Sequence, residues 1–154
     1  MASKASYTIT TSNNVSEKEA LQFLIDSDIN FINPSKESRK KIMEMLSIED
    51  RHKKAFDLVL IPGHTNLEAV INLNQTDDIT LVELKTTKKK LLNNPAGFFF
   101  GATQSEFDLA TKLGDKYQFC FVSLHPDSLS YKLLTLHELN SIIRTKRIQY
   151  QINL

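Results

Sequence analysis

The stretch ITLVELKTTKKKL, residues 79–91, is the part of the chain that best indicates the fold. Its first half is apolar and β-branched, a pattern that predicts a strand from a protein core. Side chains alternate across a strand, so Glu83 and Lys85 share a face, about 7 Å apart, while Val82 and Leu84 point to the other. This pair of charges, followed by a run of lysines, indicates either a strand end that reaches solvent or a site for charged chemistry.

The composition is that of one globular domain. The chain has 154 residues, of which 41% are hydrophobic and 24% charged. The formal net charge of +1 does not indicate a nucleic-acid partner, so any attraction to phosphate must come from local clustering. Cys120 is the only cysteine, which excludes an intrachain disulfide. Because the chain starts with a polar stretch and has no apolar run long enough to span a bilayer, we expect a cytoplasmic protein with no membrane partner.

The hydrophobic pattern predicts an α/β domain with a mixed, mainly antiparallel sheet of four or five strands flanked by helices. The expected elements are helices near 17–26 and 35–50, strands at 55–61, 67–73 and 79–85, a helix after Thr103, a strand at 117–124, and a tail with a short strand at 131–136, a short helix at 137–143 and an edge strand at 147–154. The first three strands would form a meander, and 117–124 would join 79–85 by a crossover. We treat 1–154 as a single domain with N-terminal helices at 16–50, a core at 55–124 and a C-terminal extension at 125–154.

Two helix starts have the spacing of a capping box, a serine or threonine followed three residues later by a glutamate. The pairs are Ser16 with Glu19 and Thr103 with Glu106, and Gly114 is placed to end the second helix. Glu19 could come near a site formed by the strands, and Glu106 could act as an acid. In both cases the capping interpretation is preferred.

A carboxylate and an ammonium on one strand face can perform one particular chemistry. The carboxylate binds a hard divalent cation such as Mg²⁺, with Mn²⁺ as a substitute, and the lysine orients a nucleophile beside a phosphodiester. A second carboxylate is needed to hold the ion, and Asp57, early in the apolar stretch AFDLVLI, is the preferred candidate. Asp78 is the reserve, although it falls on the opposite pleat face from Glu83. The alternative interpretation of Glu83 and Lys85 is a cross-strand ion pair at a solvated strand end.

The Asp/Glu-x-Lys triplet alone is a weak signal, since one or two are expected by chance in a chain of this composition. Here Glu83-Leu84-Lys85 is the only one, and it follows a strand that contains Asp57 and precedes a helix and a further core strand. In this order the chain resembles the PD-(D/E)xK nuclease superfamily, the restriction-endonuclease-like proteins. Phe56 stands where many members have proline, and the segment from Asp57 to Glu83 is long.

The resemblance extends to the branch that includes the NO VEIN C-terminal domains, and it covers roughly residues 55–124. Its further matching positions are the run VELKTT, the aromatic triplet at 98–100, and Thr103, Glu106, Ala110, Gly114, Asp115 and Tyr117. The resemblance implies a Mg²⁺-dependent DNA endonuclease in which Asp57, Glu83 and a backbone carbonyl near Leu84 hold the ion. Lys85 would be the third catalytic residue. A homodimer or a subunit of a restriction complex is implied in the same way.

Basic clusters are the candidates for nucleic-acid contacts. Lys88, Lys89, Lys90 and Thr86 directly follow the Glu83–Lys85 pair and are placed to meet a phosphate backbone, although a solvated loop also explains a charge run. Similar clusters, SRKK, RHKK and RTKR, lie elsewhere, and the sequence does not tell whether they share a surface. The aromatic triplet is more typical of a core than of a platform for stacked bases. The functional alternative is a non-catalytic nucleic-acid-binding or assembly subunit that keeps the nuclease fold.

Overall fold

The computed structural model describes residues 2–154, with side chains from Val15 onward. Its centre is a five-stranded mixed sheet in the order β1-β2-β3-β4-β5, in which only β3 and β4 are parallel. The strands are β1 (Phe31–Ile32), β2 (Leu58–Leu60), β3 (Thr80–Thr87), β4 (Tyr117–Ser123) and β5 (Ser130–Thr135). The predicted α/β fold class, with a mixed sheet flanked by helices, is therefore confirmed.

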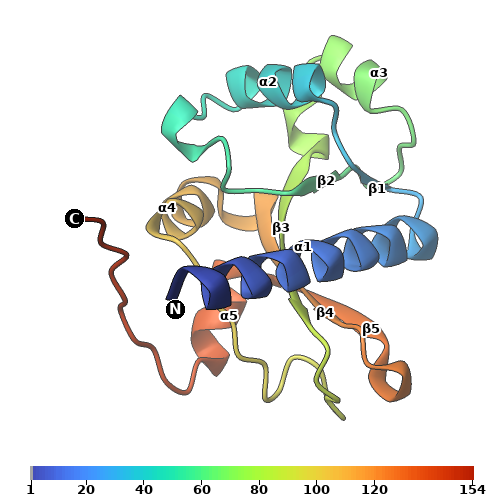
Figure 1. The fold of residues 1–154 in the computed structure, drawn as a ribbon. Helices are drawn as coiled ribbons and strands as arrows, with labels where there is room; N and C mark the ends of the chain where they lie inside the picture. The colour runs from blue at the N-terminus through green and yellow to red at the C-terminus, as the bar shows by residue number, and fades with distance from the viewer. Residues whose placement is uncertain (1) are drawn as a thin grey trace.

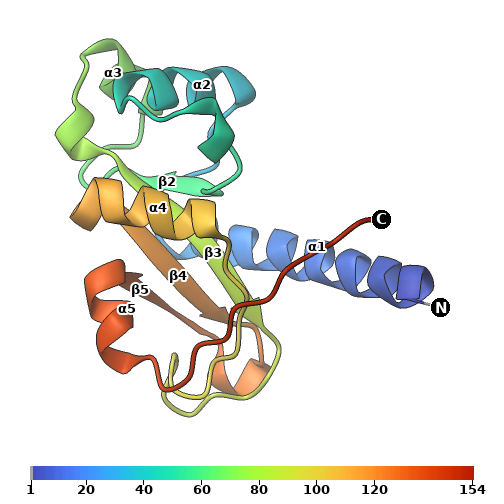
Figure 2. The same ribbon diagram turned by 90° about the vertical axis from the view of Figure 1, so that its left-hand side faces the viewer.

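Helices cover both faces of this sheet. They are α1 (Ala2–Ser27), α2 (Lys36–Met45), α3 (Leu67–Asn72), α4 (Gln104–Leu113) and α5 (Leu136–Ile142), with short 3-10 turns η1 (Asp50–His52), η2 (Thr76–Asp78), η3 (Gly114–Lys116) and η4 (Pro126–Ser128). Helix α1 crosses one face, and α4 and α5 lie on the opposite side (Figures 1 and 2). No helix among the described residues is long and apolar enough to cross a membrane.

Helix α1 begins much earlier than the sequence pattern predicts. Ser16 lies inside the helix, so the predicted capping box with Glu19 is wrong. The apolar stripe is nevertheless used as expected, because Ala20 and Leu24 are fully buried against the α1 side of the sheet.

The predicted strand at 67–73 is wrong, because these residues form α3. Asn66 caps the helix by accepting a hydrogen bond from the backbone N–H of Ala69 at 3.1 Å. Leu67, Val70 and Ile71 are the buried positions, a spacing of three and four residues that suits a helix and not a strand. The meander is therefore absent, and β2 pairs directly with β3 in the antiparallel sense.

The crossover from β3 to β4 is confirmed, with α4 between two parallel strands. Thr103 caps α4 by accepting from the backbone N–H of Glu106, and Gly114 ends it with a φ of +57°. Strand β4 is almost wholly buried, as its continuous apolar run predicts.

The C-terminal extension contributes β5 and α5 as predicted, but residues 147–154 form no strand. Four alternating apolar residues of this tail are largely exposed: Ile148, Tyr150, Ile152 and Leu154. In the part of the chain that the structure describes, no neighbouring strand pairs with this segment. An alternating pattern without a partner strand cannot form a ladder.

Candidate functional site

The site lies where β2 and β3 separate. Their register pairs Leu58 with Val82, so the residue before Leu58, Asp57, comes opposite Glu83. Asp57 still donates its backbone N–H to the carbonyl of Val82 at 2.9 Å, and its carboxylate accepts the N–H of Leu84 at 2.7 Å. The Asp57 carboxylate thus accepts the backbone N–H of Leu84 in place of a carbonyl of the β2–β3 ladder. The two predicted acids, Asp57 and Glu83, come together here although they are 26 positions apart in the sequence.

Lys85 and Glu83 meet a third acid on the first turn of α4. The Lys85 ammonium lies 3.5 Å from Oε1 of Glu83 and 2.6 Å from Oε1 of Glu106. The other oxygen of Glu106 accepts the hydroxyl of Thr103 at 2.9 Å. Glu106 therefore lies in the capped first turn of α4, bonded to the Thr103 hydroxyl, and also fixes the predicted catalytic lysine, so the capping interpretation describes only part of its role.

Burial dominates the electrostatics of these acids. Glu83 is 7% exposed, and burial, followed by the charges of Asp57 and Glu106, raises its pKa to about 9 in the metal-free protein, with Lys85 opposing the shift. Burial also raises the pKa of Asp57, although the N–H of Leu84 opposes this by stabilising the carboxylate. The Oε2 atom of Glu83 is buried without a hydrogen-bond partner. An orphaned oxygen of this kind is suited to an additional cation or donor.

The charges of the cluster are unbalanced when its acids are ionised. Three carboxylates, Asp57, Glu83 and Glu106, face the ammonium of Lys85, and the guanidinium of Arg39 adds further positive charge nearby. No group of three or more His, Cys, Asp or Glu side chains is arranged to hold a metal within the described ranges. An ion with two protein carboxylates fits better, since Mg²⁺ keeps several waters and uses one or two carboxylates. Asp57 and Glu83 match that donor set, whereas Glu106 is engaged with Lys85.

The segment that leads into Asp57 is fixed by the side chains of Arg39 and Tyr117, contacts that the sequence did not predict. Arg39, from α2, donates to the carbonyls of Lys53 and Phe56 and stacks 3.8 Å from the centre of the Phe56 ring. The buried hydroxyl of Tyr117 donates to the carbonyl of Ala55. These contacts hold the backbone just before Asp57 in place and so restrict the position of its carboxylate.

Helix α1 contributes a fourth acid at the rim, and it is Glu17 rather than Glu19. A cavity of about 290 Å³ is lined by Glu17, Lys18, Leu21, Asp57 and Leu84. Glu17 is an exposed side chain, yet partial burial and then the charge of Asp57 raise its pKa. The hydrophobic stripe of α1 indicates which residue faces the site, since Glu17 lies one turn before Leu21 and Ala20.

The other candidates are placed as follows. Asp78 bonds to His64 at 3.1 Å at the far end of β3 and is not part of the cluster. Lys88 and Lys89 are exposed just beyond β3, Lys90 pairs with Asp127 at 3.6 Å, and Thr86 is half-buried. None of these four predicted nucleic-acid contacts belongs to the buried cluster, and their role stays a prediction.

The aromatic triplet is divided between core and surface. Phe98 and Phe100 each lie 5.0 Å from the ring of Phe121 and pack edge-on, whereas Phe99 is 94% exposed. The preference for a core role is thus met by two of the three rings.

Comparison with known proteins adds no identity. No protein-family model matches the chain, and no curated protein or solved structure is similar enough to count as a match. The likeness to the PD-(D/E)xK superfamily therefore remains a sequence resemblance.

Proposed function

We propose that this chain is a Mg²⁺-dependent DNA endonuclease that hydrolyses phosphodiester bonds, with Asp57, Glu83 and Lys85 as its catalytic residues. The single observation that carries the proposal is the convergence of two acids beside an ammonium: Asp57, directly before β2, and the buried Glu83 of β3, one of whose oxygens has no partner. Clusters of acids with strongly shifted pKa values are typical of functional sites.

Asp57 and Glu83 would hold the ion together with the predicted backbone carbonyl near Leu84. Bound Mg²⁺ would polarise the phosphodiester and lower the pKa of a water, and Mn²⁺ would substitute for it. The positive charge of a bound ion would also lower the pKa of Glu83, which is about 9 in the metal-free protein, and so favour its ionised form. The donor set therefore suits a hard divalent cation.

Lys85 has the role of orienting the attacking water and offsetting the negative charge that develops on the phosphate. Its contact with Glu106 restricts the ammonium to one position, which favours a defined reaction geometry. The water oxygen would bond to phosphorus and lose a proton to solvent, while one P–O ester bond breaks and the leaving oxygen takes up a proton from solvent. One DNA end then keeps the phosphate and the other a hydroxyl. Lys88 to Lys90 and Thr86 would contact neighbouring backbone phosphates.

A second candidate is a non-catalytic nucleic-acid-binding or assembly subunit that keeps the nuclease fold. One observation favours it: Lys85 is only 10% exposed and already bonds to Glu106 at 2.6 Å, which is also the arrangement of a structural ion pair. A homodimer, or a place in a restriction complex in the cytoplasm, is compatible with either candidate.

The test is plasmid nicking by purified protein with Mg²⁺, with Mn²⁺ and with EDTA, beside Glu83→Gln and Lys85→Ala. We expect metal-dependent nicking that each substitution lowers by about a thousandfold or more, as expected when several kcal/mol of charge stabilisation are lost. Glu19→Gln, an acid on the exposed side of α1, is the control for charge and purification. Nicking that survives Glu83→Gln refutes the site, and DNA binding without cleavage in any divalent metal favours the second candidate.

A further inference from the structure

The surplus positive charge of the chain is concentrated in one segment. Residues 36–54, from α2 to the turn after η1, carry seven basic and four acidic side chains, whereas the rest of the chain has twelve basic and fourteen acidic ones. The segment ends three residues before Asp57. A nearly neutral protein therefore has a locally basic stretch next to its cluster of acids.

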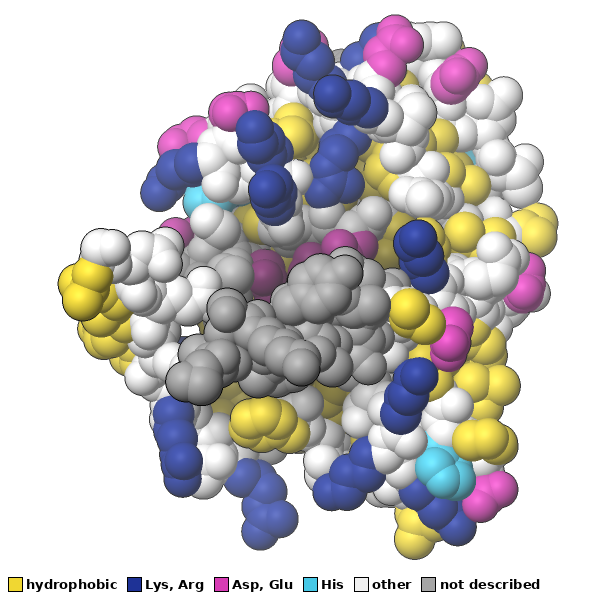
Figure 3. Space-filling model, viewed as in Figure 1, with side chains coloured by type: hydrophobic (Ala, Val, Ile, Leu, Met, Phe, Trp, Pro, Cys, Tyr) yellow, Lys and Arg dark blue, Asp and Glu magenta, His cyan; other side chains and the backbone are white. Residues whose placement is uncertain are grey.

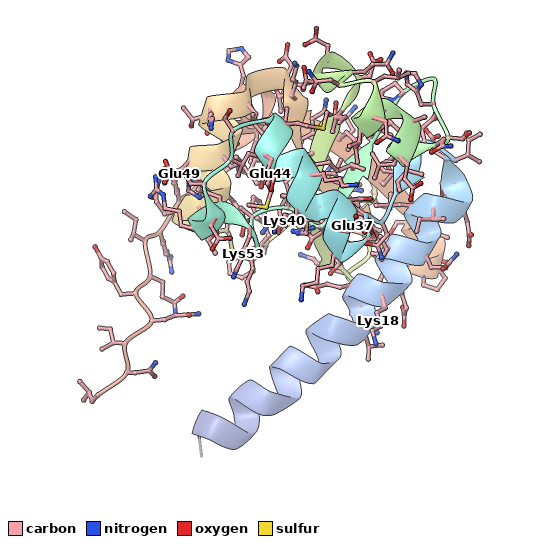
Figure 4. All side chains as sticks on the ribbon, turned by 90° about the horizontal axis from the view of Figure 1, so that it is seen from above. Lys18, Glu37, Lys40, Glu44, Glu49 and Lys53 are labelled. Carbon is pink, nitrogen blue, oxygen red and sulfur yellow. The ribbon has the colours of Figure 1, made fainter. Side chains whose placement is uncertain are left out.

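Two basic clusters that are separate in the sequence meet here. Arg39, of the SRKK cluster, donates hydrogen bonds of 3.1 and 2.8 Å to the carbonyl of Lys53, of the RHKK cluster. Figure 4 looks down on α2 and labels Lys40 and Lys53 on neighbouring parts of this segment, with Lys18 on α1. Figure 3 shows lysine and arginine side chains gathered above a recess in which acidic side chains are visible. The two clusters thus share one surface.

Three lysines of this surface have no competing acid. Lys41 lies 3.3 Å from Glu37, and Lys53 lies 3.9 Å from Asp50. By contrast, Lys36, Lys40 and Lys54 are exposed and form no ion pair with any residue that the structure describes. Of these three, Lys40 and Lys54 adjoin Arg39 and Lys53, the residues through which the two clusters are bonded. An unpaired lysine can take a backbone phosphate without breaking an existing contact, and each such contact releases counterions.

The surface is also aligned with the rest of the site. Arg39 joins it to the carbonyl of Phe56, the residue before Asp57, so the surface and the acid are held together. From Asp57 the site continues along β3 to Lys85, and β3 ends near Lys88. A phosphate backbone that follows β3 would meet positive charge before and after the acids.

We propose that residues 36–54 form a phosphate-binding surface that guides a DNA strand into the site from the α2 side, with Lys40 and Lys54 as its main contacts. The inference rests on the proposed function for the identity of the ligand, and it assigns binding to a surface that is separate from the catalytic cluster.

The experiment measures binding of a fluorescent DNA duplex by anisotropy in EDTA, over a series of KCl concentrations, so that no metal-dependent cleavage occurs. For Lys40→Gln/Lys54→Gln we expect the slope of log K against log salt to become shallower by about 1.8, with the largest weakening of Kd at the lowest KCl concentration. The control Lys116→Gln/Lys132→Gln removes the same charge at η3 and β5 and should leave the slope at the wild-type value. Thermal melting verifies that all three proteins fold.

The outcomes separate this inference from the reaction. Wild-type protein that binds DNA with the expected salt slope but never cuts it refutes the endonuclease and supports the surface. A slope that is unchanged in Lys40→Gln/Lys54→Gln, an equal loss in the control, or no DNA binding by the wild type would overturn the surface itself.

Discussion

The two faces of β3 are equally buried but differ in energetic effect. On the face toward α1, Leu84 is 6% exposed and packs with Val82 among apolar side chains. On the face toward α4, Glu83 is 7% exposed, with one oxygen unpartnered. Burying a leucine stabilises the fold by about 1.5 to 3 kcal/mol, whereas burying a carboxylate without full pairing destabilises it.

This contrast indicates which part of the molecule is suited to folding and which to chemistry. Within five consecutive residues, the chain places the apolar side chains of Val82 and Leu84 on one side of the sheet. On the other side it places Glu83, a buried acid with one oxygen unpartnered. Stability alone does not account for Glu83, since an apolar residue of similar volume there would favour folding more.

Apart from the catalytic residues Glu83 and Lys85 themselves, the largest effect expected from the α4 face concerns Glu106, the partner of Lys85. Glu106→Gln removes the negative charge 2.6 Å from the ammonium but keeps the backbone N–H that Thr103 caps. We expect the cleavage rate to fall ten- to hundredfold, about 1.4 to 2.7 kcal/mol, because Lys85 is no longer restricted to one position. Single-turnover cleavage measures it.

The matched control is Glu138→Gln. Glu138 occupies the same capping position in α5, bonded to Thr135, and contacts no lysine of the site. An equal drop in rate for Glu138→Gln would show that helix capping, and not the charge beside Lys85, is responsible.

The α1 face should respond in stability alone. Val82→Ala removes two methyl groups from a fully buried position, so the free energy of unfolding should fall by about 2 kcal/mol. Chemical denaturation measures this, and the cleavage rate per folded molecule should stay at the wild-type value. A large loss of rate in the folded variant would mean that the two faces are not separable.

The pH dependence of stability offers a third test. In the metal-free protein the pKa of Glu83 is raised from 4.5 to about 9, so between these values the folded state holds a proton that the unfolded state has lost. Stability should therefore fall as pH rises from 5 to 9, by at most about 1.4 kcal/mol per pH unit. Melting curves across this range, with and without Mg²⁺, measure it.

Two results would follow from the same cause. Glu83→Gln should flatten the pH slope, since it removes the titrating group, and Mg²⁺ should raise the melting temperature more at pH 8.5 than at pH 6. A slope that persists in Glu83→Gln would assign the effect to another group.

The smallest expected effect lies at the rim. Glu17 is exposed on α1 and close enough to Asp57 for the two charges to interact, so Glu17→Gln should lower the cleavage rate only a few-fold. Glu19→Gln, two residues along the same helix, should have no effect, and titration of the rate with Mg²⁺ compares them. Equal behaviour of the two variants would exclude Glu17 from the site.

Strand β3 could be predicted from the sequence because the signal, the alternation of side chains, lies within the strand itself. Alternation alone places Glu83 and Lys85 on one face, and the continuous apolar run of β4 predicts a fully buried strand. The 67–73 segment forms α3 and not the predicted strand, because a short apolar pattern suits both a helix and a strand. Asn66, a capping residue directly before it, was the signal for a helix.

The through-space contacts of the site were harder to predict. Arg39 reaches Phe56 across 17 positions of sequence, and Glu106 reaches Lys85 across 21. Neither contact can be inferred from the spacing of apolar residues, which predicts only which side chains share a face of one helix or strand. The buried positions Ala20 and Leu24 show which side of α1 faces the sheet, and Glu17 lies closer to that side than Glu19. This follows only if the helix continues through Ser16, which the sequence pattern did not predict.

The divided origin of the cluster has a consequence during protein synthesis. The four acids of the site come from α1, the residue before β2, β3 and α4, and they span 90 positions: Glu17, Asp57, Glu83 and Glu106. Strand β3 also lies between β2, which is synthesised earlier, and β4, which is synthesised later. A nascent chain still attached to the ribosome cannot assemble the cluster until α4 has emerged. Under the proposed function, an unfinished or truncated chain would be harmless to the genome of the cell that makes it.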